Sequence, residues 1–276
     1  MAGELERVRK TVRELGKSIE SLPADPAPQK VHKLRTASRR VEAAALVLET
    51  AHPKKSRRLV SAIEPVRKAA GGVRDMDVLT ALARKLARRG ARESLAHLLA
   101  HLENIRQQNA GELARVLHRR RKTLLETLKD YSKFVSSALK REKSDARSSD
   151  EANQNQENIH TAAMNVVREL GDWPPLDASN LHEFRLKVKE LRYTLQLDED
   201  ADPGLVAALG DVQRRIGDWH DWQQLSEIAH QVLTLEEDTP LVDRIDVTAQ
   251  RRLDRALAAA NALRAKYLSM PIAIGI

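Results

Sequence analysis

An internal repeat constrains the fold of this chain more than any other feature of its sequence. Residues 59–79 align without gaps on residues 205–225, and seven of the 21 positions are identical. The identical pairs are Leu59/Leu205, Val60/Val206, Ala62/Ala208, Val66/Val212, Gly71/Gly217, Asp75/Asp221 and Leu79/Leu225. Residues 31–35 (VHKLR) also match residues 181–185 (LHEFR), so that a histidine and an arginine coincide. We therefore expect two versions of one structural unit in succession.

Each version is expected to be helical, because apolar residues recur every three or four positions, the spacing of one face of an α-helix. No segment shows the alternation of a strand, and alanine and leucine favour helix over sheet. The fold class is therefore predicted to be all-α. The expected helices are 5–22, 29–51, 56–70, 74–89, 91–120, a further helix to about 140, 158–170, 179–197, 203–216, 218–235 and 240–268. Prolines and glycines separate them, with Gly71-Gly72 predicted to break the chain between two helices.

The predicted organisation is a single domain over residues 1–270 that consists of two repeats. The first helical half covers residues 1–140 and the second covers residues 158–270. Residues 141–157 contain almost no large apolar side chain, so we expect them to form a polar linker.

The two halves differ in charge. Residues 1–140 contain 31 Lys and Arg against 15 Asp and Glu, a net charge of +16, whereas residues 141–276 contain 16 against 24, a net charge of −8. A half this basic indicates a polyanionic partner: a nucleic acid, a membrane surface or a phosphate polymer. The chain has no cysteine, which excludes disulfides and thiol nucleophiles, and no apolar run of membrane-spanning length. We expect a soluble, cytoplasmic protein.

The repeated helices place basic residues beside the core face. At about 100° per residue, one stripe of each helix is apolar and another, about 110° round, is basic. The apolar stripes are Val31, Leu34, Val41, Ala45 and Leu48 in the first helix and Leu181, Phe184, Val188, Leu191 and Leu195 in the second. The basic stripes are His32, Arg35 and Arg39 in the first helix and His182, Arg185, Lys189 and Arg192 in the second. Solvated charges usually lie opposite the core, so this offset favours side chains that line a groove between helices.

The residue types in these stripes suit phosphate. The planar guanidinium of arginine offers paired donors to phosphate oxygens and is never neutral. A histidine beside an arginine should be mostly neutral without ligand, and an arriving anion favours its protonated form. In most amphipathic helices such charges form only a solvated surface, but their recurrence in the acidic half favours binding.

Three motifs, Val31-His-Lys-Leu-Arg-Thr-Ala-Ser-Arg-Arg40, Gly71-Gly-Val-Arg-Asp-Met-Asp-Val78 and the segment 181–193 (LHEFRLKVKELRY), resemble those of the CHAD family, the conserved histidine α-helical domain. The resemblance covers nearly the whole chain. It implies two pseudo-symmetric antiparallel helical bundles with a basic groove or pore that binds inorganic polyphosphate, often at polyphosphate granules. Carried over by position, the binding residues are His32, Arg35, Arg39, Arg40, His182, Arg185, Lys189 and Arg192. The sequence departs from the family at Glu42, which replaces a commonly basic residue, and at Glu190, which interrupts the second motif.

Further residues allow more than one interpretation. Arg74-Asp75 and His220-Asp221 follow the glycines, where an acid favours the start of a helix; alternatively, the aspartates orient arginines from a facing helix. Lys33, Arg74, His118, Arg119 and Arg120 are additional candidates for binding, although the run around Arg119 is equally well a solvated helix end. Trp219 and Trp222 are expected to be core residues rather than stacking platforms.

The sequence thus predicts a protein that binds inorganic polyphosphate without catalysis, cofactor or metal. Nucleic acid is not the expected ligand, because aromatic residues make up only 3% of the chain and no recognition-helix motif is evident. A metal-dependent phosphohydrolase acting on polyphosphate or nucleotides, suggested by the His220-Asp221 pair, and a scaffold that docks an acidic protein remain alternatives. The other metal ligands that such a hydrolase needs are not identifiable. The oligomeric state and the participation of a divalent metal in binding stay open.

Overall fold

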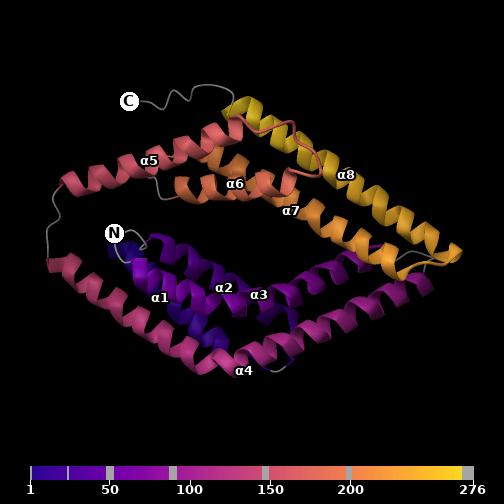
Figure 1. The fold of residues 1–276 in the computed structure, drawn as a ribbon, viewed down its shortest axis with the longest axis horizontal. Coiled ribbons are helices and arrows are strands. Elements are labelled where there is room, and N and C mark those ends of the chain that lie inside the picture. Colours follow the sequence, from indigo (N-terminus) through magenta and orange to yellow (C-terminus); the bar gives the residue numbers. More distant parts are fainter. Residues whose placement is uncertain are drawn as a thin grey trace. The chain divides into compact units, whose positions relative to one another are not determined.

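The computed structural model describes residues 2–23, 25–47, 53–86, 92–144, 149–196 and 201–268 (Figure 1). All regular secondary structure in these residues is helical, which confirms the predicted all-α class. The helices are α1 (Ala2–Glu20), α2 (Pro28–Val47), α3 (Pro53–Arg84), α4 (Arg92–Ser144), α5 (Ser149–Gly171), α6 (Leu181–Leu195), α7 (Pro203–Val232) and α8 (Thr239–Leu263). A 3-10 turn, Glu236–Asp238, precedes α8, and a π turn, Arg264–Leu268, follows it. None of the helices in the described part is both long and apolar enough to cross a membrane.

The chain divides into two compact units, each with its own core. The first unit contains residues 1–85 and 98–146, and the second contains residues 86–97 and 147–276. Helices α1 to α3 and most of α4 therefore form the first unit, whereas the first residues of α4 belong with α5 to α8. The expected polar linker, 141–157, is helical wherever it is described, because α4 extends to Ser144 and α5 begins at Ser149. Once a helix is nucleated it propagates at little cost, so polar composition alone does not end it.

The apolar stripes predicted for α2 and α6 form the centre of the two cores. Val31, Leu34, Val41 and Ala45 are fully buried in α2, against side chains of α1, α3 and α4. In α6 the fully buried residues are Leu181, Phe184, Val188 and Leu191. Trp219 and Trp222 of α7 are buried as well, as expected for core residues. Leu48 lies outside the described residues.

The glycines that were predicted to end helices lie inside them instead. Helix α3 runs through Gly71 and Gly72, and α7 runs through Gly217, so the four short helices expected here are two long ones. A Cβ atom at Gly71 would lie 3.2 Å from Nη1 of Arg35, and one at Gly217 would lie 3.3 Å from Nη2 of Arg185. These glycines therefore allow a side chain of the facing helix to approach the backbone closely.

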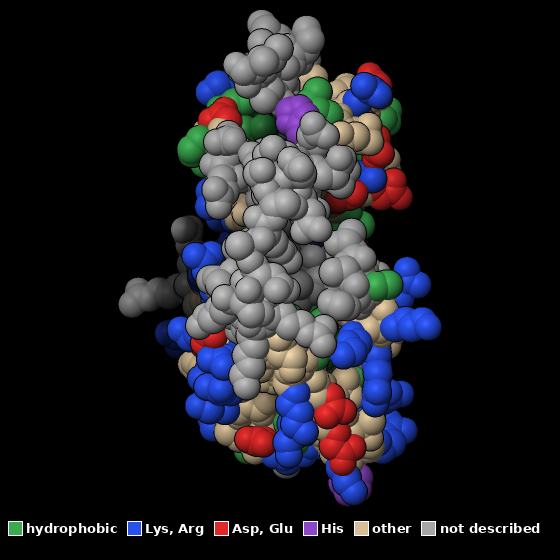
Figure 2. All heavy atoms as spheres, turned by 90° about the vertical axis from the view of Figure 1, so that its left-hand side faces the viewer, with side chains coloured by type: hydrophobic (Ala, Val, Ile, Leu, Met, Phe, Trp, Pro, Cys, Tyr) green, Lys and Arg blue, Asp and Glu red, His purple; other side chains and the backbone are tan. Residues whose placement is uncertain are grey.

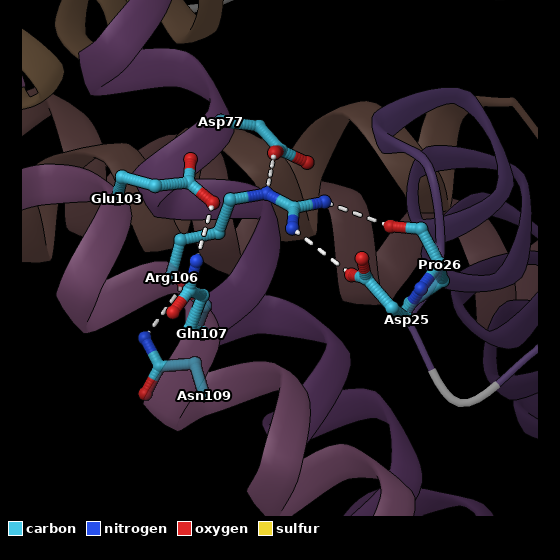
Figure 3. A network of polar contacts seen from close by, with 8 residues as sticks. Asp25, Pro26, Asp77, Glu103, Arg106, Gln107 and Asn109 are labelled. Carbon is cyan, nitrogen blue, oxygen red and sulfur yellow. Dashed lines mark hydrogen bonds and ion pairs between the residues drawn. The ribbon is translucent and has the colours of Figure 1, made fainter.

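A buried ion pair joins α4 to two other parts of the first unit (Figure 3). The guanidinium of Arg106, only 10% exposed, donates through Nε to Oδ1 of Asp77 at 2.8 Å and through Nη2 to the carbonyl oxygen of Pro26 at 2.7 Å. Its Nη1 lies 3.5 Å from Oδ1 of Asp25 in the turn between α1 and α2. Burial alone would lower the pKa of Arg106, but the hydrogen bond and charge of Asp77 raise it. The network holds α3, α4 and the α1–α2 turn together.

Candidate functional site

Arginines gather in the first unit where α2 packs on α3. We define the first seam by Arg35 and Arg39 of α2 and by Arg67, Arg74 and Asp75 of α3. Nη2 of Arg35 lies 4.0 Å from Oδ1 of Asp75. Burial and the charge of Arg39 lower the pKa of Arg35, the carboxylate of Asp75 opposes them, and Arg67 and Arg74 lower the pKa further. Four positive charges therefore lie close enough to interact, which favours a bound anion.

The second unit repeats this arrangement between α6 and α7. The second seam is defined by four residues of α6 and by the four residues of α7 that face them. These are His182, Arg185, Lys189 and Arg192 of α6 and Gly210, Gln213, Gly217 and His220 of α7. Nε of Arg185 donates to the backbone carbonyl of Gln213 at 3.2 Å. Nη1 of Arg192 donates to Oε1 of the same glutamine at 3.0 Å, and its guanidinium lies over Gly210, 3.5 Å from where a Cβ would be.

An open groove of about 1010 Å³ lies along the part of the second seam that contains Arg185 and Arg192. Its polar lining consists of Arg185, Arg192, Gln196, Gln213, Arg214, Asp218 and Asp221. The predicted arginines therefore do line a groove in this unit. Whether both seams line one shared groove stays a prediction.

The interpretation of Arg74-Asp75 and His220-Asp221 as helix starts is wrong, because both pairs lie in the interior of continuous helices. The alternative, that the aspartates orient arginines from the facing helix, agrees with the ion pair between Asp75 and Arg35. Asp221, at the matching position, lines the same groove as Arg185.

Glu42 replaces a commonly basic residue of the family, but the first seam still has a guanidinium at this place, that of Arg67. Oε1 of Glu42 accepts a hydrogen bond from Nε of Arg67 at 2.6 Å. In the repeat, Glu42 and Arg67 correspond to Arg192 and Gln213, which are also hydrogen-bonded to each other. Each seam thus holds one guanidinium at this point, on α3 in one unit and on α6 in the other. Sequence reasoning missed Arg67, although its exchange with Glu42 is visible in the repeat alignment.

The sequence pattern singled out His220 only together with Asp221, as a helix start or part of a metal site, and not as a neighbour of the basic stripe. Its ring on α7 lies beside that of His182 on α6, with 5.5 Å between the ring centroids and 37° between the planes. Partial burial lowers the pKa of His182, and the charges of His220 and Arg185 lower it further. This direction agrees with the expectation of a histidine that is neutral until an anion arrives. His32, the counterpart of His182, is exposed on α2.

The remaining candidates on α2 and α6 are less constrained. Lys33, Arg39 and Arg40 are exposed. Lys189 lies over the ring of Tyr193, 5.5 Å from its centroid. The carboxylate of Glu190, the second departure from the family pattern, lies 3.3 Å from Nζ of Lys187.

His118, Arg119 and Arg120 are exposed in the interior of α4, so the interpretation of this run as a helix end is wrong. Nη2 of Arg119 lies 3.9 Å from Oε1 of Glu112. Its neighbour Arg121 donates to the backbone carbonyl of Glu20, at the end of α1. This part of the run therefore stabilises a helix end of α1, and its role in binding stays a prediction.

Figure 2 shows Lys and Arg side chains gathered over the first unit, in the lower part of the view. This agrees with the excess of basic residues in its sequence. Within the described residues, no group of three or more His, Asp or Glu side chains is placed to hold a metal ion.

Comparisons with known proteins agree with this fold. The crystal structure of the CHAD domain from the plant Ricinus communis has a similar fold, with a TM-score of 0.61 over 96% of this chain and 91% of that chain, at 20% sequence identity. A search of curated proteins found no match. The family model described as CHAD domain matches residues 6–230, which is most of the chain and includes both seams. The chain therefore belongs to the CHAD-domain family.

Proposed function

We propose that this chain binds inorganic polyphosphate along its two seams and releases it chemically unchanged. One observation carries the proposal: in each unit an arginine lies directly over a glycine of the facing helix, Arg35 over Gly71 and Arg185 over Gly217. A glycine in a helix interior costs stability relative to alanine. Its occurrence at both matched positions supports a function for the guanidinium that it accommodates.

The arrangement of the arginines suits a chain of phosphates. Arg185, Lys189 and Arg192 recur once per turn of α6, so their positions are about 5 Å apart along the helix. Hydrogen bonds to Gln213 already fix the guanidiniums of Arg185 and Arg192, which reduces the entropy lost on binding. A polymer that carries charge on every unit and no bases needs no aromatic platform, which agrees with the scarcity of aromatic residues.

The test is a titration of the protein with long-chain inorganic polyphosphate. The double variant Arg35→Glu/Arg185→Glu should lose binding while its helicity, measured by circular dichroism, is unchanged. A matched control, Arg13→Glu/Arg255→Glu, makes the same change of charge at one exposed position in each unit. It should retain most of the affinity. Normal binding by the first variant, or equal loss in both variants, would contradict the proposal.

Three further measurements separate the proposal from the alternatives. Competition between polyphosphate and DNA of matched charge should favour polyphosphate, and preference for DNA would indicate a nucleic-acid binder. Incubation of polyphosphate with the protein and divalent metals should release no phosphate, since release would indicate a phosphohydrolase. Co-purification of an acidic protein that polyphosphate does not displace would indicate a docking scaffold. In cells, we expect the protein in the cytoplasm at polyphosphate granules.

A further inference from the structure

At one matched position the difference between the two seams affects how their charge depends on pH. His220 in α7 corresponds to Arg74 in α3 in the repeat alignment. Arg74 acts electrostatically on Arg35, and His220 acts in the same way on His182, which lies one turn before Arg185. The first seam therefore holds a permanent charge where the second seam holds a titratable imidazole.

We propose that His220 is a ligand-contacting residue, which together with His182 and Arg185 forms a phosphate subsite whose positive charge increases as the pH falls. The inference rests on the proposed function and extends it. The first seam binds polyphosphate at any physiological pH, whereas the affinity of the second seam for polyphosphate rises as the pH falls. The two rings come from different helices and lie 5.5 Å apart, so one phosphate can contact both. His182 is exposed and His220 is half-buried, so that an anion can reach the pair.

The charges around the pair leave a place for an anion. On α6, Glu183 and Arg185 act on His182 with opposite sign. Asp221 follows His220 on α7 and lines the groove that contains Arg185. On each of the helices packed on the two sides, α5 and α8, one charged residue is engaged in an ion pair. Glu169 of α5 binds Lys187 at 2.6 Å, and Arg252 of α8 binds Asp218 at 2.9 Å.

Two neighbouring imidazoles repel each other when both are charged, and a phosphate between them removes that repulsion. By linkage, a ligand that favours protonation must bind more tightly as protons become available. Each proton taken up with the ligand contributes about a tenfold gain in affinity per pH unit, over the range between the free and the bound pKa.

The experiment measures the affinity of the full chain for long-chain polyphosphate between about pH 8 and about pH 5. In His220→Arg, the number of protons taken up on binding, given by the slope of log affinity against pH, should fall by up to one. The affinity at the alkaline end should rise about two- to fivefold, the range for an exposed ion pair. The reciprocal variant, Arg74→His, should steepen the dependence by making the first seam resemble the second. Titration of the polyphosphate itself is common to all variants and cancels in the comparison.

The matched control is His230→Arg, which adds the same charge to the same helix about 15 Å further along. His230 is exposed and paired with Asp246 at 2.9 Å, a partner that an arginine can retain. It should leave the pH dependence as in the unmodified chain. A dependence that is unchanged in His220→Arg, or flattened equally in His230→Arg, overturns the assignment of His220 and leaves the proposed function standing. Failure of the unmodified chain to bind polyphosphate at any pH overturns both.

Discussion

Replacing Gly71 or Gly217 by alanine should stabilise the protein and weaken polyphosphate binding at the same time. Both glycines lie in helix interiors, where glycine is less favourable than alanine by about 1 kcal/mol. The added Cβ would meet the end of a guanidinium, at 3.2 Å from Arg35 or 3.3 Å from Arg185. Such a contact is relieved when the guanidinium moves by a few tenths of an ångström. The side chain of Arg35 is 21% exposed, so it has room for this movement.

Other glycines of the chain provide a graded series for the same substitution. A Cβ at Gly210 would lie 3.5 Å from Arg192, which is an ordinary van der Waals contact, and one at Gly111 in α4 would meet nothing within 4 Å. All four substitutions should therefore raise the free energy of unfolding by up to about 1 kcal/mol, because the gain in helix propensity is the same. Affinity should fall in the order of the contacts, most for Gly71 and Gly217, less for Gly210 and not at all for Gly111.

Urea unfolding gives the stabilities, and titration with polyphosphate gives the affinities. If Gly71→Ala and Gly217→Ala instead destabilise the fold by more than about 1 kcal/mol, the guanidiniums are rigid structural elements and the reasoning is wrong. Unchanged affinity in the combined variant would refute the claim that these glycines position a binding residue.

The remaining predictions concern the buried ion pair, the exchanged pair and the effect of acid. Arg106→Met should cost about 3–5 kcal/mol in urea unfolding because it leaves the carboxylate of Asp77 buried without its partner, and adding Asp77→Ala should cost little more. Glu42→Gln should raise the affinity for polyphosphate, since it removes the carboxylate that neutralises Arg67 and leaves an amide, as at Gln213; a decrease would show that Arg67 needs this carboxylate to be held in place. Because burial and neighbouring charges lower the pKa of His182 in the folded state, its contribution to stability is present above its usual pKa and is lost as the pH falls through the lowered value. Unfolding midpoints at neutral and acidic pH should therefore differ less in His182→Gln than in the unmodified chain, and an equal difference would contradict this sign.

Most of the fold followed from patterns that are local in the sequence. The periodicity of apolar residues predicted the buried faces of α2 and α6, and the prolines after α1 predicted its end. The helix boundaries at glycines were wrong, since glycine has the same low helix propensity whether it ends a helix or accommodates a neighbour. Only the position of Arg35 over Gly71 distinguishes the two cases, and these residues belong to different helices.

The candidate site was predicted in part. The stripes on α2 and α6 were found because they lie on one helix each. Arg67 and His220 were missed as members of the seams because they reach them from the facing helices α3 and α7. Their contribution depends on which side of a neighbouring helix they meet, and no spacing within one segment contains that information.

By itself, the sequence determined the helical class, the repeat, the faces that form the two cores and the helices that carry the basic stripes. Each of these features depends on residues a few positions apart or on a direct comparison of two segments. The tertiary structure alone decided which arginines are held against glycine, that Glu42 and Arg67 contact each other, and which histidine stands beside His182. These features arise where separate helices pack, and the distance and orientation across such a contact are set by the whole core rather than by the local chain.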